Sequence, residues 1–224
     1  MKVRKSLFLV AACAVALLAF TTNAWADLVT FAPPLNGTVW RVPGNLQPAP
    51  IVAPAVPPAI LEGTFTAAQI DFSVGGSGTL SSFLNSHGSG VTTALTSGSG
   101  DQMSNCNFVT TSFPCYSTVI HLASVGPVTF LAGDYTLTHD DGAVMSIGGV
   151  TKVNSPAPTQ PIGSTFTLGA TTVGDLSIWY MATNTNPEVL KLTATVVPEP
   201  ASVLLLGTVL VGLAAIKRRQ MRRS

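Results

Sequence analysis

Residues 134–147 read Asp134-Tyr135-Thr136-Leu137-Thr138-His139-Asp140-Asp141-Gly142-Ala143-Val144-Met145-Ser146-Ile147, and this stretch decides the fold. Apolar and polar side chains alternate before and after Asp140-Asp141-Gly142, as they do in strands with one buried face. Asp-Gly between two alternating runs is among the best short signals for a β-hairpin. We therefore predict two antiparallel strands joined by a tight turn.

Similar strand signals extend outward on both sides of this stretch. They lie at residues 64–74, 118–124, 127–132, 176–182 and 189–196. The intervening residues 75–100 are rich in Gly and Ser and predict loops, with a short helix or turn at 79–84. Short strands, frequent turn signals and no sustained helical period predict an all-β protein with a β-sandwich fold.

The N-terminus has the three parts of a secretory signal peptide. Met1 to Lys5 carry three basic residues, an apolar segment follows from Ser6 to Phe20, and Ala24-Trp25-Ala26 offers a small-x-small cleavage site. We predict export by the Sec translocase and cleavage by signal peptidase between Ala26 and Asp27. Acylation of Cys13 as a lipoprotein is the alternative, but the apolar run continues well beyond that cysteine.

The remaining chain divides by composition. Residues 27–60 form a Pro-rich segment, with six prolines between Pro43 and Pro58 that disfavour sheet pairing and indicate an extended arm or a surface-crossing segment. We assign residues 61–196 to the β-sandwich domain. Residues 197–224 form a separate C-terminal segment.

That C-terminal segment combines a short motif, an apolar run and a basic end. Pro198-Glu199-Pro200 precedes sixteen uncharged residues from Ala201 to Ile216, and Arg218 and Arg219 follow. As a helix the run would extend about 24 Å, short for a bilayer core of about 30 Å, but basic side chains at its end can snorkel. We predict a single C-terminal transmembrane helix with the basic end in the cytoplasm.

The order of these three parts resembles the PEP-CTERM sorting signal of Gram-negative bacteria. The resemblance implies processing by an exosortase and an association with exopolysaccharide and biofilm matrix. It also implies that the inner membrane holds the protein transiently, before release to the cell surface or extracellular matrix. A plain membrane anchor with a chance Pro198-Glu199-Pro200 is the alternative.

The charge of the exported region differs from that of the whole chain. The whole chain has a formal charge of +1, but eight of its eleven Lys and Arg lie in the two terminal segments. Arg41, Lys152 and Lys191 remain against nine acids between Asp27 and Val197, so this region carries about −6. Nucleic-acid binding is excluded, because it needs clustered basic residues.

Two cysteines remain after removal of the signal peptide. Cys106 and Cys115 would enter an oxidising compartment, so we predict a disulfide between them. Eight intervening residues do not form a Cys-x-x-Cys redox motif. The disulfide is therefore expected to be a structural staple.

Residues 128–196 resemble the anthrax protective-antigen-type domain. The first matching part is a strand, an Asp-Asp-Gly turn, a second strand and the Gly148-Gly149 turn. The second is a closing hairpin of Ser177–Tyr180 with Val189–Leu192. The resemblance implies a carbohydrate-binding sandwich in which Asp140 and Asp141 hold Ca²⁺ that also contacts sugar hydroxyls. Further oxygens would come from Asn184, Asn186 and Glu188. The other interpretation gives Asp140-Asp141-Gly142 no role beyond turn chemistry.

Signals for catalysis are weaker. His87, His121 and His139 have no zinc-ligand spacing, and nothing fixes the separation of Asp134 and Asp141 as glycosidase carboxylates. Trp40 and Trp179 could stack on sugars or lie in the core. We expect a non-enzymatic, secreted protein, with two hypotheses open: a calcium-dependent glycan-binding protein, or a structural matrix component without ligand.

Overall fold

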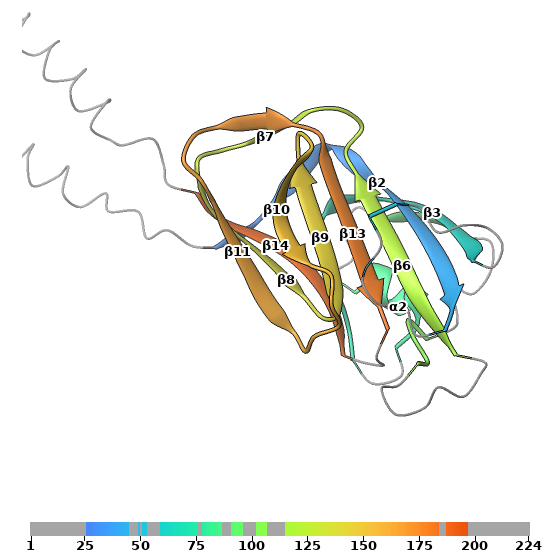
Figure 1. Cartoon of the computed structure of the whole chain (residues 1–224). Coiled ribbons are helices and arrows are strands. Elements are labelled where there is room, and N and C mark those ends of the chain that lie inside the picture. The colour runs from blue at the N-terminus through green and yellow to red at the C-terminus, as the bar shows by residue number, and fades with distance from the viewer. Residues whose placement is uncertain are drawn as a thin grey trace, which may run out of the picture.

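A computed structural model describes residues 26–44, 49, 51–52, 59–75, 78–86, 91–95, 102–106, 115–183 and 187–196 (Figure 1). Its elements are β1 (Asp27–Leu28), β2 (Thr30–Pro43), β3 (Ile60–Gln69), β4 (Asp71–Val74), α2 (Leu80–Leu84), β5 (Thr92–Leu95), β6 (Tyr116–Ala123), β7 (Val128–Phe130), β8 (Gly133–His139), β9 (Gly142–Ile147), β10 (Val150–Ser155), β11 (Ile162–Leu168), β12 (Thr172–Gly174), β13 (Leu176–Ala182) and β14 (Glu188–Val196).

Two antiparallel sheets form the body of the protein. The large sheet has the strand order β10-β9-β13-β6-β2-β3-β5, and the small sheet has the order β1-β14-β8-β11 with β4 also paired to β14. A separate ladder of β12 and β7 lies at the end of the molecule near the turn between β9 and β10 (Figure 1). The predicted β-sandwich is confirmed.

The central prediction of a hairpin at residues 134–147 is wrong in its pairing. Both strands form, but β8 pairs with β14 and β11 in the small sheet, while β9 pairs with β10 and β13 in the large sheet. Asp140 and Asp141 thus carry the chain from one sheet to the other. Alternation of apolar and polar residues shows only that a strand buries one face. It does not indicate which neighbouring strand is the hydrogen-bonding partner.

Two residues fit the backbone to this crossing. Asp141 has a φ of 63°, in the left-handed region that Asp tolerates better than most residues. Gly142 is crowded, because a Cβ there would lie 2.3 Å from the Pro156 carbonyl oxygen and 2.9 Å from the Ala49 Cβ. The Gly after the two aspartates therefore permits close packing rather than a hairpin turn.

The glycine turn does form a hairpin. Gly148 and Gly149 have φ of 57° and 76° and join β9 to β10, with Ile147 opposite Val150. Positive φ at both central residues is the type I′ geometry favoured in two-residue hairpins. The expected closing hairpin of residues 177–180 with 189–192 does not form, because β13 and β14 lie in different sheets.

The segment 27–60, expected as a Pro-rich arm, contributes strands to both sheets. β1 pairs with β14, and the fourteen-residue β2 lies between β6 and β3 in the large sheet. Two register shifts in the β2–β3 ladder accompany this strand, one of them between Thr30 and Leu35, where the two prolines Pro33 and Pro34 fall. Further on, Ala49 is buried and donates its N–H to the Pro156 carbonyl at 2.7 Å.

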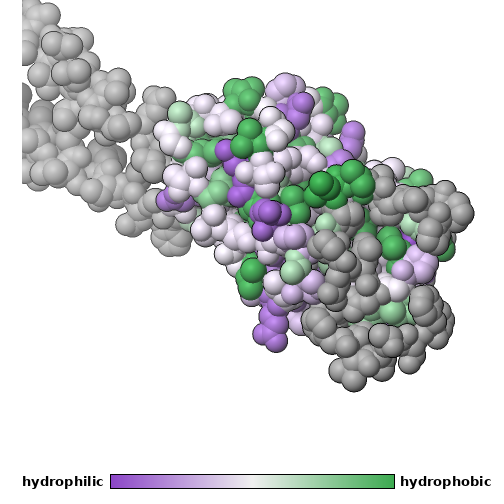
Figure 2. Space-filling model, in the orientation of Figure 1, coloured by the Kyte–Doolittle hydropathy of each residue, from purple (hydrophilic) through white to green (hydrophobic). Residues whose placement is uncertain are grey.

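The hydrophobic core fills the space between the sheets. Its side chains alternate with outward ones along the strands, as Tyr135 and Leu137 do in β8 and Ile178 and Tyr180 do in β13. Helix α2 adds Phe83, whose ring stacks on Tyr180 at a centroid distance of 5.9 Å. On the face seen in Figure 2, hydrophobic and hydrophilic residues are interspersed.

The crowding at Gly142 gives a test of the crossing. Gly142→Ala should lower the free energy of unfolding by about 1–3 kcal/mol, because the added methyl group must displace the Pro156 backbone. Gly169→Ala is the matched control, since a Cβ at Gly169 meets no atom within 4 Å. Urea unfolding of both variants checks this, and equal stabilities would contradict the packing described.

Candidate functional site

Three carboxyl groups lie together at the end of the sandwich where the chain changes sheets. Asp140 and Asp141 come from the β8–β9 crossing, and Glu188 is the first residue of β14. Their residues are only 6 %, 1 % and 1 % exposed. The Asp140 N–H donates to the Val189 carbonyl at 3.0 Å, which joins the crossing to β14.

Asp141 holds the end of β13. Its Oδ2 accepts the Thr183 N–H at 2.7 Å, directly after that strand ends. Its own N–H donates to the Thr159 carbonyl at 3.1 Å. This carboxylate therefore has a structural contact that links the crossing to the large sheet.

Glu188 is held from across the interior. The Tyr180 hydroxyl donates to Glu188 Oε2 at 2.6 Å, so the bond joins β13 in the large sheet to β14 in the small sheet. The second oxygen, Oε1, is buried and has no hydrogen-bond partner among the described residues. A buried acceptor without a donor is costly, and it leaves one oxygen at this site open to a proton or a cation.

His139 lies beside the carboxyl groups but adds no positive charge. Its Nδ1 donates to the Asp141 carbonyl at 2.7 Å, and the Ser164 hydroxyl lies 2.9 Å from Nε2. Burial lowers the pKa of His139, against smaller opposing effects of the Asp141 carbonyl and carboxylate. The neutral tautomer with the proton on Nδ1 satisfies both contacts.

Burial also dominates the electrostatics of the acids. It raises the pKa of Asp140 from 3.8 to about 7, with a further contribution from the Asp141 charge and a smaller opposing one from the Asp141 backbone. Burial and the Asp141 charge raise the pKa of Glu188 well above its usual value, although the Tyr180 hydroxyl acts in the opposite direction. Arg41 and Lys191 pair elsewhere, with Glu62 and Asp71.

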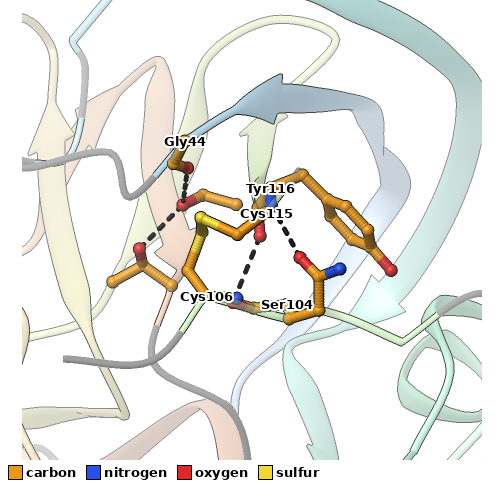
Figure 3. Close-up of a disulfide and its surroundings, with 8 residues drawn as sticks. Gly44, Ser104, Cys106, Cys115 and Tyr116 are labelled. Carbon is orange, nitrogen blue, oxygen red and sulfur yellow. Dashed lines mark hydrogen bonds between the residues drawn. A yellow bond between two sulfur atoms is a disulfide. The ribbon is translucent and has the colours of Figure 1, made fainter. Parts of the chain in front are cut away.

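A disulfide braces this end of the molecule. Cys106 and Cys115 are bonded, as predicted (Figure 3). The Cys115 carbonyl accepts the Gly44 N–H at 2.7 Å, and the Gly44 carbonyl accepts the Ser117 hydroxyl at 3.0 Å. Ser117 in turn lies 2.7 Å from the Thr183 hydroxyl, next to the N–H that Asp141 accepts. The disulfide is thus connected to the acidic site through hydrogen bonds.

The other predicted candidates do not join the site. Asp134 is exposed near the opposite end of β8 from Asp141, so these two acids form no catalytic pair. Trp40 and Trp179 are buried and stack on one another at 5.9 Å, and His121 stacks on Trp179 at 4.0 Å. These rings pack on the outer side of the large sheet rather than forming an open platform.

Several predicted residues lie outside the described residues. They are His87, Asn184, Asn186, Pro198, Glu199, Pro200, Arg218 and Arg219. Ala26 and Asp27, the predicted cleavage site, lie at the start of the described chain, and Asp27 opens β1. Signal cleavage remains a prediction.

The donor set suits calcium in kind but does not complete a site. Carboxylate oxygens are the ligands Ca²⁺ prefers, and it takes six to eight of them. No group of three or more His, Cys, Asp or Glu within the described ranges is arranged to hold a metal ion. Asp140 and Glu188 Oε1 offer carboxyl oxygens, but these are fewer than Ca²⁺ takes.

Sequence reasoning missed three members of the site. Tyr180 and Thr183 carried no signal beyond membership of a strand and its end. His139 was considered as a metal ligand, whereas it is a neutral histidine bonded to the crossing. The alternation of β8 could have placed His139 on the inner face with Leu137 and Tyr135.

Comparison with known proteins identifies the C-terminal segment. Residues 196–219 match the PEP-CTERM protein-sorting motif. The motif implies an exported chain that an exosortase processes at the membrane, and the predicted sorting signal is confirmed. No curated protein matches the chain in sequence.

Solved structures that match this chain include two PA14 domains. The PA14 sugar-binding domain from an RTX adhesin is 19% identical with a TM-score of 0.49, covering 71% of this chain and 87% of that one. The PA14 domain of the MpAFP antifreeze protein is 19% identical with a TM-score of 0.46, and the match covers 71% of this chain and 81% of that one. The GH31 alpha-xylosidase from Xanthomonas citri is 10% identical with a TM-score of 0.38, covering 79% of this chain and 16% of that one.

The predicted membrane helix falls where the structure gives no description. In the described part of the chain, no helix has the length and apolar character needed to cross a membrane. The apolar run from Ala201 to Ile216 lies outside that part. Anchoring by this run remains a prediction.

Loss of the disulfide should destabilise the fold. Replacing Cys106 and Cys115 together by Ser should lower the free energy of unfolding by about 2–3 kcal/mol. The reason is that the unfolded chain regains the conformational freedom lost when the disulfide closes a loop of eight intervening residues. Denaturant unfolding of the variant beside the oxidised protein checks this. A midpoint that does not move would show that the bond constrains neither state.

The raised pKa of Asp140 predicts a pH dependence in metal-free protein. Between about pH 4 and 7 the native state binds more protons than the unfolded state, so this carboxyl's contribution to stability falls as pH rises. His121 and His139, whose pKa values burial lowers, act in the opposite direction below their usual value of 6.5. The variant Asp140→Asn keeps both histidines and isolates the Asp140 contribution.

Unfolding should be measured in chelator at several pH values for both proteins. Wild type should lose stability relative to Asp140→Asn as pH rises from 4 to about 7 and then level off. A constant difference across this range would show that the Asp140 carboxyl keeps its ordinary pKa.

Proposed function

We propose that this protein is delivered by exosortase processing to the surface or matrix of a Gram-negative bacterium, where its sandwich binds glycans with calcium. Asp140 and Asp141 would contribute carboxylates to the ion. The observation that carries the proposal is the burial of Asp140, Asp141 and Glu188 together at one end of the fold. We propose binding rather than catalysis.

The electrostatics of the site support a cation. Burial and, to a smaller extent, the charge of the neighbouring Asp141 raise the pKa of Asp140 to about 7, so ionising these carboxyl groups together is costly. A bound divalent ion removes that cost, because it supplies positive charge and accepts oxygens directly. Glu188 Oε1, which has no described donor, is an oxygen of the required kind.

The incomplete donor set supports a ligand beyond the ion. The crossing and β14 offer fewer oxygens than calcium takes, so other groups would complete its shell. Asn184 and Asn186 follow β13 in sequence, and water or neighbouring sugar hydroxyls could fill further positions. Hydroxyl pairs of a glycan are hard oxygens in suitable spacing, which would make sugar binding depend on calcium.

A sequence resemblance and the sorting motif both support a glycan as the ligand. Residues 128–196 resemble the carbohydrate-binding sandwich of the anthrax protective-antigen type. The sorting motif at residues 196–219 supports exosortase processing. The resemblance to the PEP-CTERM signal implies an association with exopolysaccharide. A glycan of that matrix is the ligand we propose.

A structural matrix protein without ligand is the second candidate. The bond from the Thr183 N–H to Asp141 Oδ2 gives this carboxylate a use within the fold. A protonated Asp140 and Glu188 would then complete the site. The two candidates differ in whether calcium stabilises the protein.

The chain from Asp27 to Val197 should be tested on a glycan array with calcium and with chelator. We expect calcium-dependent binding that Asp140→Ala and Asp141→Ala abolish, and stabilisation by calcium of about 2.7 kcal/mol at a hundredfold excess over Kd. Asp134→Ala, an exposed acid on β8, is the control and should leave binding unchanged.

The outcomes separate the candidates. Calcium stabilisation without glycan binding would leave the ion a structural role and reject the lectin function. Absence of both effects would favour the structural matrix protein.

A further inference from the structure

The sandwich has sheet edges of different kinds. In the small sheet, β11 lies at one side, and the short strands β1 and β4 share the other side with two and four residues. In the large sheet, the edges are β10 and the four-residue β5. An edge strand presents backbone N–H and C=O groups that can pair with another chain.

The edges other than β11 have features that hinder pairing. β10 carries Lys152 and a register shift between Thr151 and Val153. β1, β4 and β5 are too short to offer a long ladder. Lysine, bulges and short length are the usual means of protecting an edge.

β11 has none of these features. Its seven residues are Ile162-Gly163-Ser164-Thr165-Phe166-Thr167-Leu168, without charge or proline. Its ladder with β8 runs from Ile162 opposite His139 to Leu168 opposite Gly133 with no register shift. Figure 1 shows it at the border of the sandwich.

The inner face of β11 is firmly held. Phe166 stacks on Tyr135 at 5.2 Å, and the Ser164 hydroxyl lies 2.9 Å from His139 Nε2. Leu168 is buried, while Gly163, Thr165 and Thr167 are exposed. The strand is therefore preorganised, and pairing of its free side would cost little conformational entropy.

We infer that β11 is the edge at which two copies of this chain join, antiparallel, into one continuous sheet. A two-fold axis at Thr165 pairs Ile162 with Leu168, Gly163 with Thr167, and Ser164 with Phe166. This register uses all seven residues and keeps the inner faces of both copies on one side. It brings no two charges opposite each other.

This interface goes beyond the proposed function and does not depend on it. β11 lies at the side of the small sheet, whereas the acidic site lies at the end of β8 and β14. A dimer would carry two copies of that site on one rigid sheet. Because each exported copy carries about −6, added salt should strengthen the dimer.

Charge substitutions at Thr165 test the interface. Thr165→Lys and Thr165→Glu each place like charges opposite one another at the axis, so each should weaken the dimer about fivefold to tenfold. An equimolar mixture of the two variants should restore it. Thr151→Lys, exposed on the bulged edge β10, is the control and should have no effect.

Analytical ultracentrifugation of the exported chain in detergent measures the dissociation constant of the dimer for each variant. Thermal unfolding shows that each variant is folded. Independently, Thr165→Cys should give a disulfide-linked dimer in intact cells, since Cys106 and Cys115 are already paired. Thr151→Cys should not. A protein that is monomeric at all concentrations would overturn the inference. So would a dimer whose dissociation constant does not change with the charge at position 165 and that Thr165→Cys does not crosslink.

Discussion

The passage of the chain from the small sheet to the large one at Asp140, Asp141 and Gly142 is the constraint on which the rest of the sandwich depends. Two hydrogen bonds hold the sheets together at this point, from the Thr183 N–H to Asp141 and from the Tyr180 hydroxyl to Glu188. The absence of a Cβ at Gly142 lets Pro156 and Ala49 pack against the crossing. Asp141 and Glu188 therefore stabilise the fold, whether or not they also belong to a binding site.

This arrangement has an electrostatic cost that shapes what the site can do. Three carboxyl groups are buried together, and two of the described basic side chains, Arg41 and Lys191, pair with acids elsewhere. Such a cluster keeps protons to unusually high pH or takes up a cation, because unpaired buried charges are unfavourable. The neutral His139 cannot supply the missing charge, since its Nδ1 donates to a carbonyl and burial lowers its pKa.

The sequence predicted the strands of this region better than their partners. The alternation in residues 134–147 located β8 and β9 closely, but Asp-Gly indicated a hairpin where the chain instead crosses between sheets. Alternation reports one buried face, and a sandwich has two sheets that can receive it. β11 was missed because its buried face is interrupted by Ser164, whose partner His139 lies on another strand. Likewise, Glu188 was named only through a resemblance, since its contact with Tyr180 exists only when the sheets are packed.

The course of β14 decides how sorting and binding can coexist. Glu188 opens this strand within the acidic site, and Val196, opposite Gly133, closes it at the other end of β8. The sorting motif begins at that closing residue, so a chain held by its tail, as we predict, would present the acidic site away from the point of attachment. β11 lies on neither end but along the side of the sheet. The proposed attachment, ligand binding and pairing of copies would therefore occupy different parts of one small sheet, and none of them would exclude another.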